Sequence, residues 1–171
     1  MLKMTEQKTF RLAGVKWTVL DKTEKGYSCI ADSIGDRRFD EKCNDWKQSD
    51  LRKYLNGEFL TKLEASVRAE NIVPLERDLL SLDGQTEYGT CVDKVSMLTV
   101  DEYRKYRAAL PNTGEWWWLI TPDSTVCNND SSWMAVVSPH GSIFSYGGYC
   151  SRYGVRPVCI FSSAIFESEE A

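Results

Sequence analysis

The stretch that decides the fold is Trp116-Trp117-Trp118-Leu119-Ile120-Thr121-Pro122, where the chain changes character. From here to Phe166, short apolar segments alternate with turn residues, a pattern that predicts a β-meander with long loops. We expect the large aromatic side chains of residues 116–118 and of Trp133 to be buried and to anchor this sheet. The predicted strands cover residues 116–120, 133–137, 142–144 and 155–161.

The first 115 residues predict a β-hairpin followed by two helices. Apolar and polar residues alternate over 15–19, and a second run over 27–31 returns after a polar turn. Ser49 is expected to cap a helix over 50–66 that is stepped at Asn56-Gly57. A capping box of Thr99 and Glu102 predicts a second helix over 99–109. Residues 33–44 and 71–93 are expected to form loops.

The order of these elements predicts the fold class. Helices in the first half and strands in the second favour an α+β fold, with two helices packed on an antiparallel sheet, over a fold of βαβ units. A length of 171 residues suits one domain. We therefore expect a single domain over residues 1–163 and an acidic, disordered tail over residues 164–171.

Composition narrows the classes of partner. The net charge is −4 and no Lys/Arg cluster stands out, which argues against nucleic acid as a partner. No apolar run approaches the roughly 20 residues that span a membrane, so membrane insertion is not expected. The N-terminal residues lack the apolar core of a signal peptide, so synthesis in the cytoplasm is expected. Display on a phage virion or on a cell surface stays open.

The cysteines do not predict a metal site or a cofactor. The chain contains six cysteines but no CxxC pair, and His140 is its one histidine. A structural zinc site is therefore not expected. Reduced and mostly buried thiols are the simpler interpretation. The cysteines are Cys29, Cys43, Cys91, Cys127, Cys150 and Cys159.

The segment 124–154 has the composition of a recognition loop region. It contains seven Ser, four Gly, three Tyr and two Asn, the residue types that dominate antibody recognition loops. Tyr offers a rigid amphipathic contact, while Ser, Gly and Asn adapt their hydrogen bonds. An ordinary Ser/Gly-rich loop region would have the same bias. The residues expected to bind ligand are Ser124, Asn128, Asn129, Asp130, Ser131, Ser132, Ser138, His140, Ser145, Tyr146, Tyr149, Cys150, Ser151, Arg152 and Tyr153.

A second bias in composition supports a recognition role for the same part of the chain. No Lys, Glu or Gln occurs in the 51 residues from Trp116 to Phe166, whereas the first 115 residues contain 11 Lys, 10 Glu and 3 Gln. At the rate of the first 115 residues, this segment would contain about ten. Buried strands lose some of these residues, but a polar loop region should not lose all three types.

Several motifs resemble those of a family of bacterial and phage domains with a C-type-lectin or formylglycine-generating-enzyme-like fold. The resemblance covers residues 10–161 and depends on the order and spacing of four motifs. These are Trp17-Thr18-Val19-Leu20-Asp21, Trp46 with Ser49-Asp50-Leu51-Arg52-Lys53-Tyr54-Leu55-Asn56, Trp117-Trp118-Leu119-Ile120-Thr121-Pro122, and Gly154-Val155-Arg156-Pro157. The resemblance implies a C-type-lectin-like scaffold with long C-terminal loops.

Some members of this wider group are the variable proteins of diversity-generating retroelements. There a reverse transcriptase randomises adenines of a template, and the copy overwrites the C-terminal end of the binding domain. Asn codons randomised in this way cannot give Lys, Glu or Gln, which matches the missing residue types. The resemblance thus implies a diversified surface, with Gly154 at a tight turn and Arg156 pinning the end of the variable loop.

Two other interpretations stay open, although we do not expect an enzyme. Formylglycine-generating relatives use a C-terminal cysteine pair, and Cys150 and Cys159 lie there with Arg152 and Arg156 nearby. A Cys–His pair using His140 lacks an evident third group. The alternative is a fixed carbohydrate- or protein-binding module of a phage or bacterial surface. Lectins of this fold class often hold sugars through calcium, but no Glu-x-Asn or Trp-Asn-Asp ligand pattern accompanies Asn128, Asn129 and Asp130, so calcium is not predicted. The ligand is an unidentified protein or carbohydrate.

Overall fold

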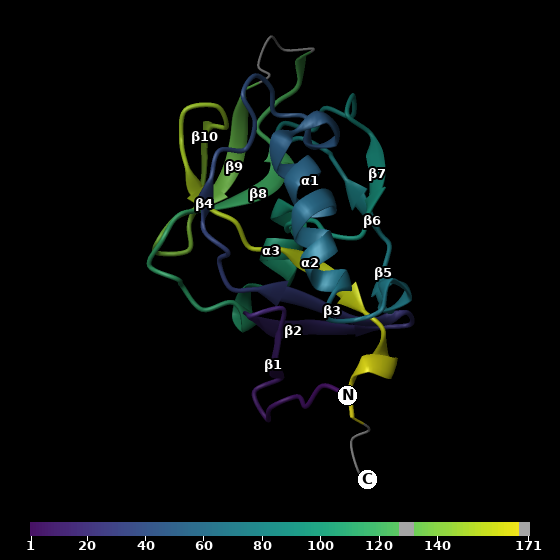
Figure 1. Ribbon diagram of the computed structural model, residues 1–171. Coiled ribbons are helices and arrows are strands. Elements are labelled where there is room, and N and C mark those ends of the chain that lie inside the picture. The colour runs from purple at the N-terminus through teal and green to yellow at the C-terminus, as the bar shows by residue number, and fades with distance from the viewer. Residues whose placement is uncertain (127–131, 168–171) are drawn as a thin grey trace.

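The computed structural model describes residues 1–126 and 132–167 and shows an α+β fold with two five-stranded sheets (Figure 1). The N-terminal sheet has the order β1-β2-β3-β12-β5 and comprises Thr9–Leu12, Val15–Thr23, Gly26–Ala31, Val158–Phe161 and Ile72–Val73. The C-terminal sheet has the order β10-β9-β8-β11-β4 and comprises Ile143–Gly147, Trp133–Val137, Trp117–Pro122, Tyr153–Gly154 and Asp36–Arg37. A separate hairpin is formed by β6 (Leu75–Asp78) and β7 (Thr90–Asp93).

The N-terminal sheet joins both ends of the chain. The predicted hairpin is confirmed as the antiparallel pair β2–β3. The last strand, β12, lies between β3 and β5 and is antiparallel to both. It carries Phe161, which is fully buried against Phe10 and Trp17 in edge-to-face contacts. In Figure 1 this sheet and both chain ends occupy the lower half of the view, while β8, β9 and β10 lie above.

One long helix packs its apolar side chains into the core that it shares with both sheets. It consists of α1 (Asp50–Tyr54), a π-helical turn over Leu55–Phe59 and α2 (Leu60–Glu64). The step predicted at Asn56-Gly57 is this π-helical turn. Every fourth residue of the helix, namely Leu51, Leu55, Phe59 and Leu63, is buried in one core with Trp17, Trp118 and Phe161. That spacing places the four side chains along one face of the helix.

The second predicted helix is shorter than expected. Its helical part, α3, covers Val100–Lys105 and is followed by a single 3-10 turn at Arg107–Ala109. The capping box is confirmed, because Thr99 accepts a bond from the Glu102 amide and Glu102 accepts one from the Thr99 amide. A second core lies under α3, where Tyr103 packs against Trp117.

Trp133 does not anchor the C-terminal sheet, contrary to the expectation. Its side chain is 44% exposed, whereas Trp117 and Trp118 are buried. Trp133 begins β9, and its partner across the strand pair is Gly147, which offers no side chain to pack against. Trp116 precedes β8 and is only partly buried. The sheet is therefore anchored by β8, whose residues are all buried.

Three segments expected to be irregular are ordered. Residues 71–93 contain β5 and the hairpin β6–β7, and residues 33–44 contain the short strand β4. The expected tail over 164–171 is part of the domain in its first residues, because Ile165 and Phe166 are buried and Leu2 bridges to Phe166. Their apolar side chains complete the aromatic core around Phe10 and Tyr27. Residues 168–171 lie outside the described residues.

Candidate functional site

Four partly exposed aromatic side chains form a continuous patch on the C-terminal sheet, which we call the aromatic face. Trp116 lies at its centre. Its ring centroid is 5.5 Å from that of Phe144, 5.2 Å from that of Tyr146 and 5.7 Å from that of Tyr153. Tyr146 and Tyr153 also contact each other at 5.8 Å, so each ring is held by neighbours. Phe144 is 47% exposed, and the other three are partly buried.

The strands place these rings on one side of the sheet. Phe144 and Tyr146 are two residues apart on the edge strand β10 and therefore point to the same side. Tyr153 lies on β11, which is paired in parallel with β8. Below the patch, the Tyr153 ring centroid lies 4.9 Å from that of Trp118, and Trp118 donates from Nε1 to the carbonyl of Arg37 at 2.8 Å. The buried Trp118 thus forms a rigid base for the patch.

A second exposed group lies where the β9–β10 hairpin opens, which we call the Gly147 end. Trp133 is the strand partner of Gly147, and Tyr149 is 49% exposed with its ring next to Gly147. Cys150 is exposed here, and its Sγ donates to the Gly147 carbonyl at 3.6 Å. Of the expected site residues, Asn128, Asn129, Asp130 and Ser131 lie outside the described residues.

Two expected site residues are structural instead. Ser124 is buried and donates from Oγ to Asp83 at 2.6 Å, while its carbonyl accepts from Asn44. Ser138 is buried at the turn that closes the β9–β10 hairpin, where its Oγ accepts from the Ser142 amide. Both hydroxyls are satisfied inside the protein, which explains why polar residues are buried there.

The remaining expected residues divide between the two ends of the hairpin. Arg152 is exposed and Ser151 is half-buried, and both lie beside Tyr153. Ser132 and Ser145 are half-buried, and Ser145 donates to Asp123 at 2.5 Å. His140 is exposed on the opposite turn, next to Gly141, whose carbonyl accepts from Tyr103. The structure therefore brings Tyr146, Tyr149 and Arg152 toward one end, and it places His140 at the other.

A small pocket of about 190 Å³ lies beside β4, whose Arg37 is the strand partner of Tyr153 in the aromatic face, and we call it the arginine pocket. Arg37 is the strand partner of Tyr153, and its guanidinium lies 3.4 Å from the centre of the Tyr54 ring. Sequence reasoning missed this pocket, because Arg37 and Arg38 lie in a segment without periodicity, more than 100 residues from Arg152. The pocket is lined by Arg37, Arg38, Asp50, Leu51, Tyr54 and Arg152.

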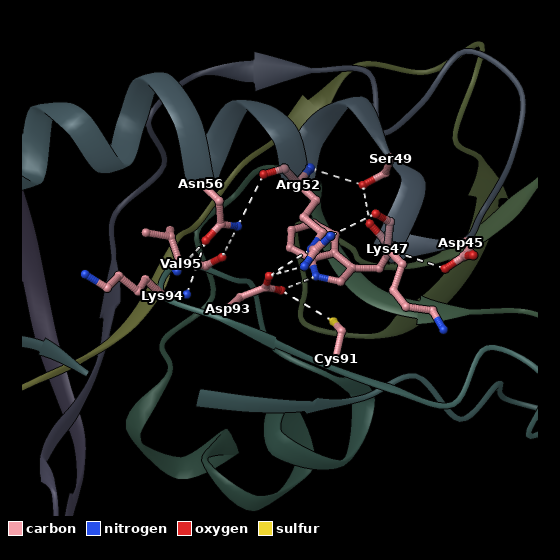
Figure 2. Close-up of polar contacts among 10 residues, drawn as sticks. Asp45, Lys47, Ser49, Arg52, Asn56, Cys91, Asp93, Lys94 and Val95 are labelled. Atoms are coloured by element: carbon pink, nitrogen blue, oxygen red, sulfur yellow. Dashed lines mark hydrogen bonds and ion pairs between the residues drawn. The ribbon is translucent and has the colours of Figure 1, made fainter. Parts of the chain in front are cut away.

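The motif that opens the first helix has a structural role (Figure 2). The Asp93 carboxylate accepts from Trp46 Nε1 at 2.8 Å and forms an ion pair with Arg52 at 2.8 Å. Asn56 accepts from the amides of Lys94 and Val95, as Figure 2 shows. Trp46 and Arg52 therefore fasten the start of the helix to the last residue of β7, and Asn56 fastens it to the segment that follows. These contacts give the motif residues a structural role.

Arg156 also has a structural role, as expected from the resemblance. It is buried, donates from Nε to the Ala31 carbonyl at 3.1 Å and lies 4.8 Å from the Trp117 ring. Burial lowers the pKa of its guanidinium, while the nearby Asp32 carboxylate acts in the opposite direction. Gly154 lies against the Trp116 carbonyl, and an added Cβ would approach that oxygen to 3.1 Å.

The cysteines of the enzyme alternative lie in different places. Cys159 is fully buried in β12, where Cys29 is its direct strand partner, and burial raises the pKa of both thiols. Cys150 is exposed at the Gly147 end. A buried thiol with a raised pKa is a poor nucleophile. Within the described residues, no three His, Cys, Asp or Glu side chains are grouped so that they could hold a metal ion.

No helix in the described part of the chain is both long enough and apolar enough to cross a membrane. Comparison with curated proteins and with solved structures gives no match. Residues 76–163, which include all but the first residue of the hairpin β6–β7 as well as α3 and the aromatic face, match a family model. This match spans about half of the chain, and the chain belongs to the family described as Domain of unknown function (DUF6273).

Proposed function

We propose that this chain is a ligand-binding protein of the receptor or adhesin type, whose recognition surface consists of the aromatic face and the Gly147 end. The observation that carries this proposal is the cluster of four mutually contacting, partly exposed rings around Trp116. Exposed aromatic patches on a folded domain mark interaction sites more often than chance. Tyr and Trp are also the residues that dominate binding hot spots.

The arrangement of rigid and adaptable residues supports recognition. The aromatic rings hold one another and stand on buried Trp118, so little conformational entropy is lost when a ligand contacts them. Around them, Ser132, Ser151 and Tyr149 offer hydroxyl groups. This combination of rigid aromatic anchors and adaptable polar groups is typical of paratopes.

We further propose that the scaffold is C-type-lectin-like and that the surface is diversified by a retroelement. The resemblance of the four motifs supports the scaffold, as does the pairing of strands from both chain ends in one sheet. The absence of Lys, Glu and Gln from Trp116 to Phe166 supports diversification. The proposed diversified positions do not include the buried Ser124 and Ser138, because a different residue there would lose internal hydrogen bonds.

Population sequencing tests the diversification. We expect related isolates to differ at exposed positions such as Tyr149, Cys150 and Arg152, while Ser124 and Ser138 stay constant. A template repeat beside a reverse transcriptase gene should match the segment except at adenines. Substitutions spread evenly over the chain, or the lack of any template repeat, would contradict diversification and favour a fixed binding module.

Binding measurements test the recognition surface itself. Probes are an array of immobilised glycans and a panel of whole bacterial cells, tested with the 171-residue chain. A Tyr146→Ala, Tyr149→Ala double variant is expected to lose binding while its melting temperature falls by only a few degrees, because Tyr149 is 49% exposed and Tyr146 is partly exposed. The matched control is Tyr106→Ala, which removes a half-buried tyrosine at the C-terminal end of α3. Equal binding by the double variant and the parent would reject the proposed surface.

A further inference from the structure

We infer that the arginine pocket binds an oxyanion of an acidic glycan, a carboxylate or a sulfate, whose sugar rings then lie on the aromatic face. This inference rests on the proposed function, because it names the ligand class of that surface. The pocket adjoins the patch directly, since Arg37 and Tyr153 are strand partners across the pair β4–β11. Such partners have Cα atoms roughly 4.5–5.5 Å apart.

The arginines of the pocket differ from most others in the chain because they have no polar partner among the residues that the structure describes. Six of the ten arginines make side-chain hydrogen bonds or ion pairs, such as Arg52 with Asp93 and Arg77 with Glu102. Within the described residues, Arg37, Arg38 and Arg152 make neither, and the same holds for Arg11. Three of the four arginines without polar partners thus surround one small pocket.

Geometry prepares Arg37 to bind a planar anion. Its guanidinium lies 3.4 Å from the centre of the Tyr54 ring, which fixes one face and leaves the N–H edges free. Guanidinium groups bind carboxylates and sulfates through two parallel N–H donors. Asp50 also lines the pocket and has an ion-pair contact with Lys53 at 4.0 Å. Three arginines against one aspartate give this pocket a positive charge in a chain whose net charge is −4.

The surroundings favour a glycan over an acidic peptide. A volume of about 190 Å³ has room for one small charged group and little else. An added peptide strand needs an exposed sheet edge, but β4, the edge beside the pocket, is two residues long. Next to the pocket lie ring faces and tyrosine hydroxyls, which suit the apolar faces and hydroxyls of sugar rings. The ligand expected from this arrangement is a short uronate- or sulfate-bearing oligosaccharide.

Calorimetry with three defined trisaccharides tests the inference. The probes are a galacturonic acid trisaccharide, its neutral methyl ester and a sulfated neutral trisaccharide. At least one acidic probe is expected to bind about tenfold or more tighter than the neutral ester. Arg37→Gln and Arg152→Gln should each weaken that binding about tenfold. Asp50→Asn should strengthen it, because it removes the one carboxylate that lines the pocket.

The control is Arg11→Gln, which removes an equal charge from another exposed arginine without a polar partner and should leave binding unchanged. An equal loss in this control would show general charge attraction and overturn the inference. So would equal binding of the neutral ester, or a lack of binding of both acidic probes at millimolar concentration. If Tyr146→Ala abolishes binding that Arg37→Gln leaves intact, the proposed surface stands and the oxyanion pocket does not.

Discussion

Replacing each of two tryptophans of the C-terminal sheet by alanine tests which of them belongs to the core and which to the surface. The buried Trp118 should lose much more stability than the exposed Trp133. Trp118 is fully buried between Phe39 and Tyr153, with ring centroids 6.0 and 4.9 Å away. Trp118→Ala should lower the free energy of unfolding by roughly 3–5 kcal/mol through lost packing. Loss of its hydrogen bond to the Arg37 carbonyl adds roughly 1 kcal/mol.

Trp133→Ala removes a side chain that is 44% exposed. Because only about half of the Trp133 surface is buried in the folded chain, the expected loss of stability is roughly 1–1.5 kcal/mol. At roughly 2–4 °C per kcal/mol for a chain of this size, Trp118→Ala should lower the melting temperature by roughly 10–20 °C and Trp133→Ala by a few degrees.

Urea unfolding followed by circular dichroism measures both changes without depending on tryptophan fluorescence. The parent chain and the two variants are compared at equal concentration. Equal destabilisation by the two substitutions would refute the assignment of Trp133 to the surface. Trp133 would then be part of the core, and the Gly147 end could not be a recognition surface.

Three other predictions follow from polar and titratable groups. Asp93→Ala leaves Trp46 and Arg52 without their partner and should destabilise the chain by roughly 3–5 kcal/mol. The control Asp101→Ala, at an exposed ion pair, should cost less than about 0.5 kcal/mol. Similar urea midpoints for the two variants would count against a stabilising role for the contacts of Asp93. Burial raises the pKa of Glu102, but its ion pair with Arg77 outweighs this effect and holds the pKa below its usual value. The stability that this pair contributes is complete above about pH 4.3, the ordinary pKa of glutamate, and is lost as the pH falls through the lowered pKa of the folded state. Glu102→Gln should therefore flatten the acid side of a curve of stability against pH. An unchanged slope would contradict the assignment. Among the five cysteines that the structure describes, Cys150 should react first in a thiol-labelling time course on native protein, and faster labelling of the buried thiols would show that the sheet opens.

Periodicity predicted the regular parts of the fold well. The strand expected over residues 133–137 has those bounds in the structure, and the hairpin near the N-terminus lies where the alternation placed it. The capping box at Thr99 was also found, because its two hydrogen bonds join residues three apart in the sequence. Such features depend on local sequence and can be predicted without knowing the fold.

The hairpin β6–β7 was missed because a buried charge hides its alternation. In β6 the buried residues are Leu75 and Arg77, so the strand looks polar in sequence after its first residue. Arg77 is buried only because Glu102 and the Met97 carbonyl accept its hydrogen bonds. Partners 20 or more residues away cannot be read from local sequence, and the same reason explains the buried Ser124, whose partners are Asp83 and Asn44.

The candidate site was predicted in part. Composition identified Tyr146, Tyr149 and Tyr153, and all three have side chains that reach the surface. Trp116 and Phe144 were treated as strand residues, because an aromatic residue on the open side of a sheet looks like a core residue in sequence. The arginine pocket joins residues that the chain separates by more than 100 positions, so only the pairing of β4 with β11 reveals it.

The position of β12 in the middle of the N-terminal sheet has a consequence for faulty copies of the gene. Every residue of the proposed variable segment is translated before β12, which β3 and β5 need as their common partner. A stop codon or frameshift in that segment removes Phe161 and exposes the apolar faces of both neighbours. Such a product cannot close its core and is left to proteolysis. The topology thus prevents truncated chains from folding, because the N-terminal sheet is complete only in a chain that is translated through β12.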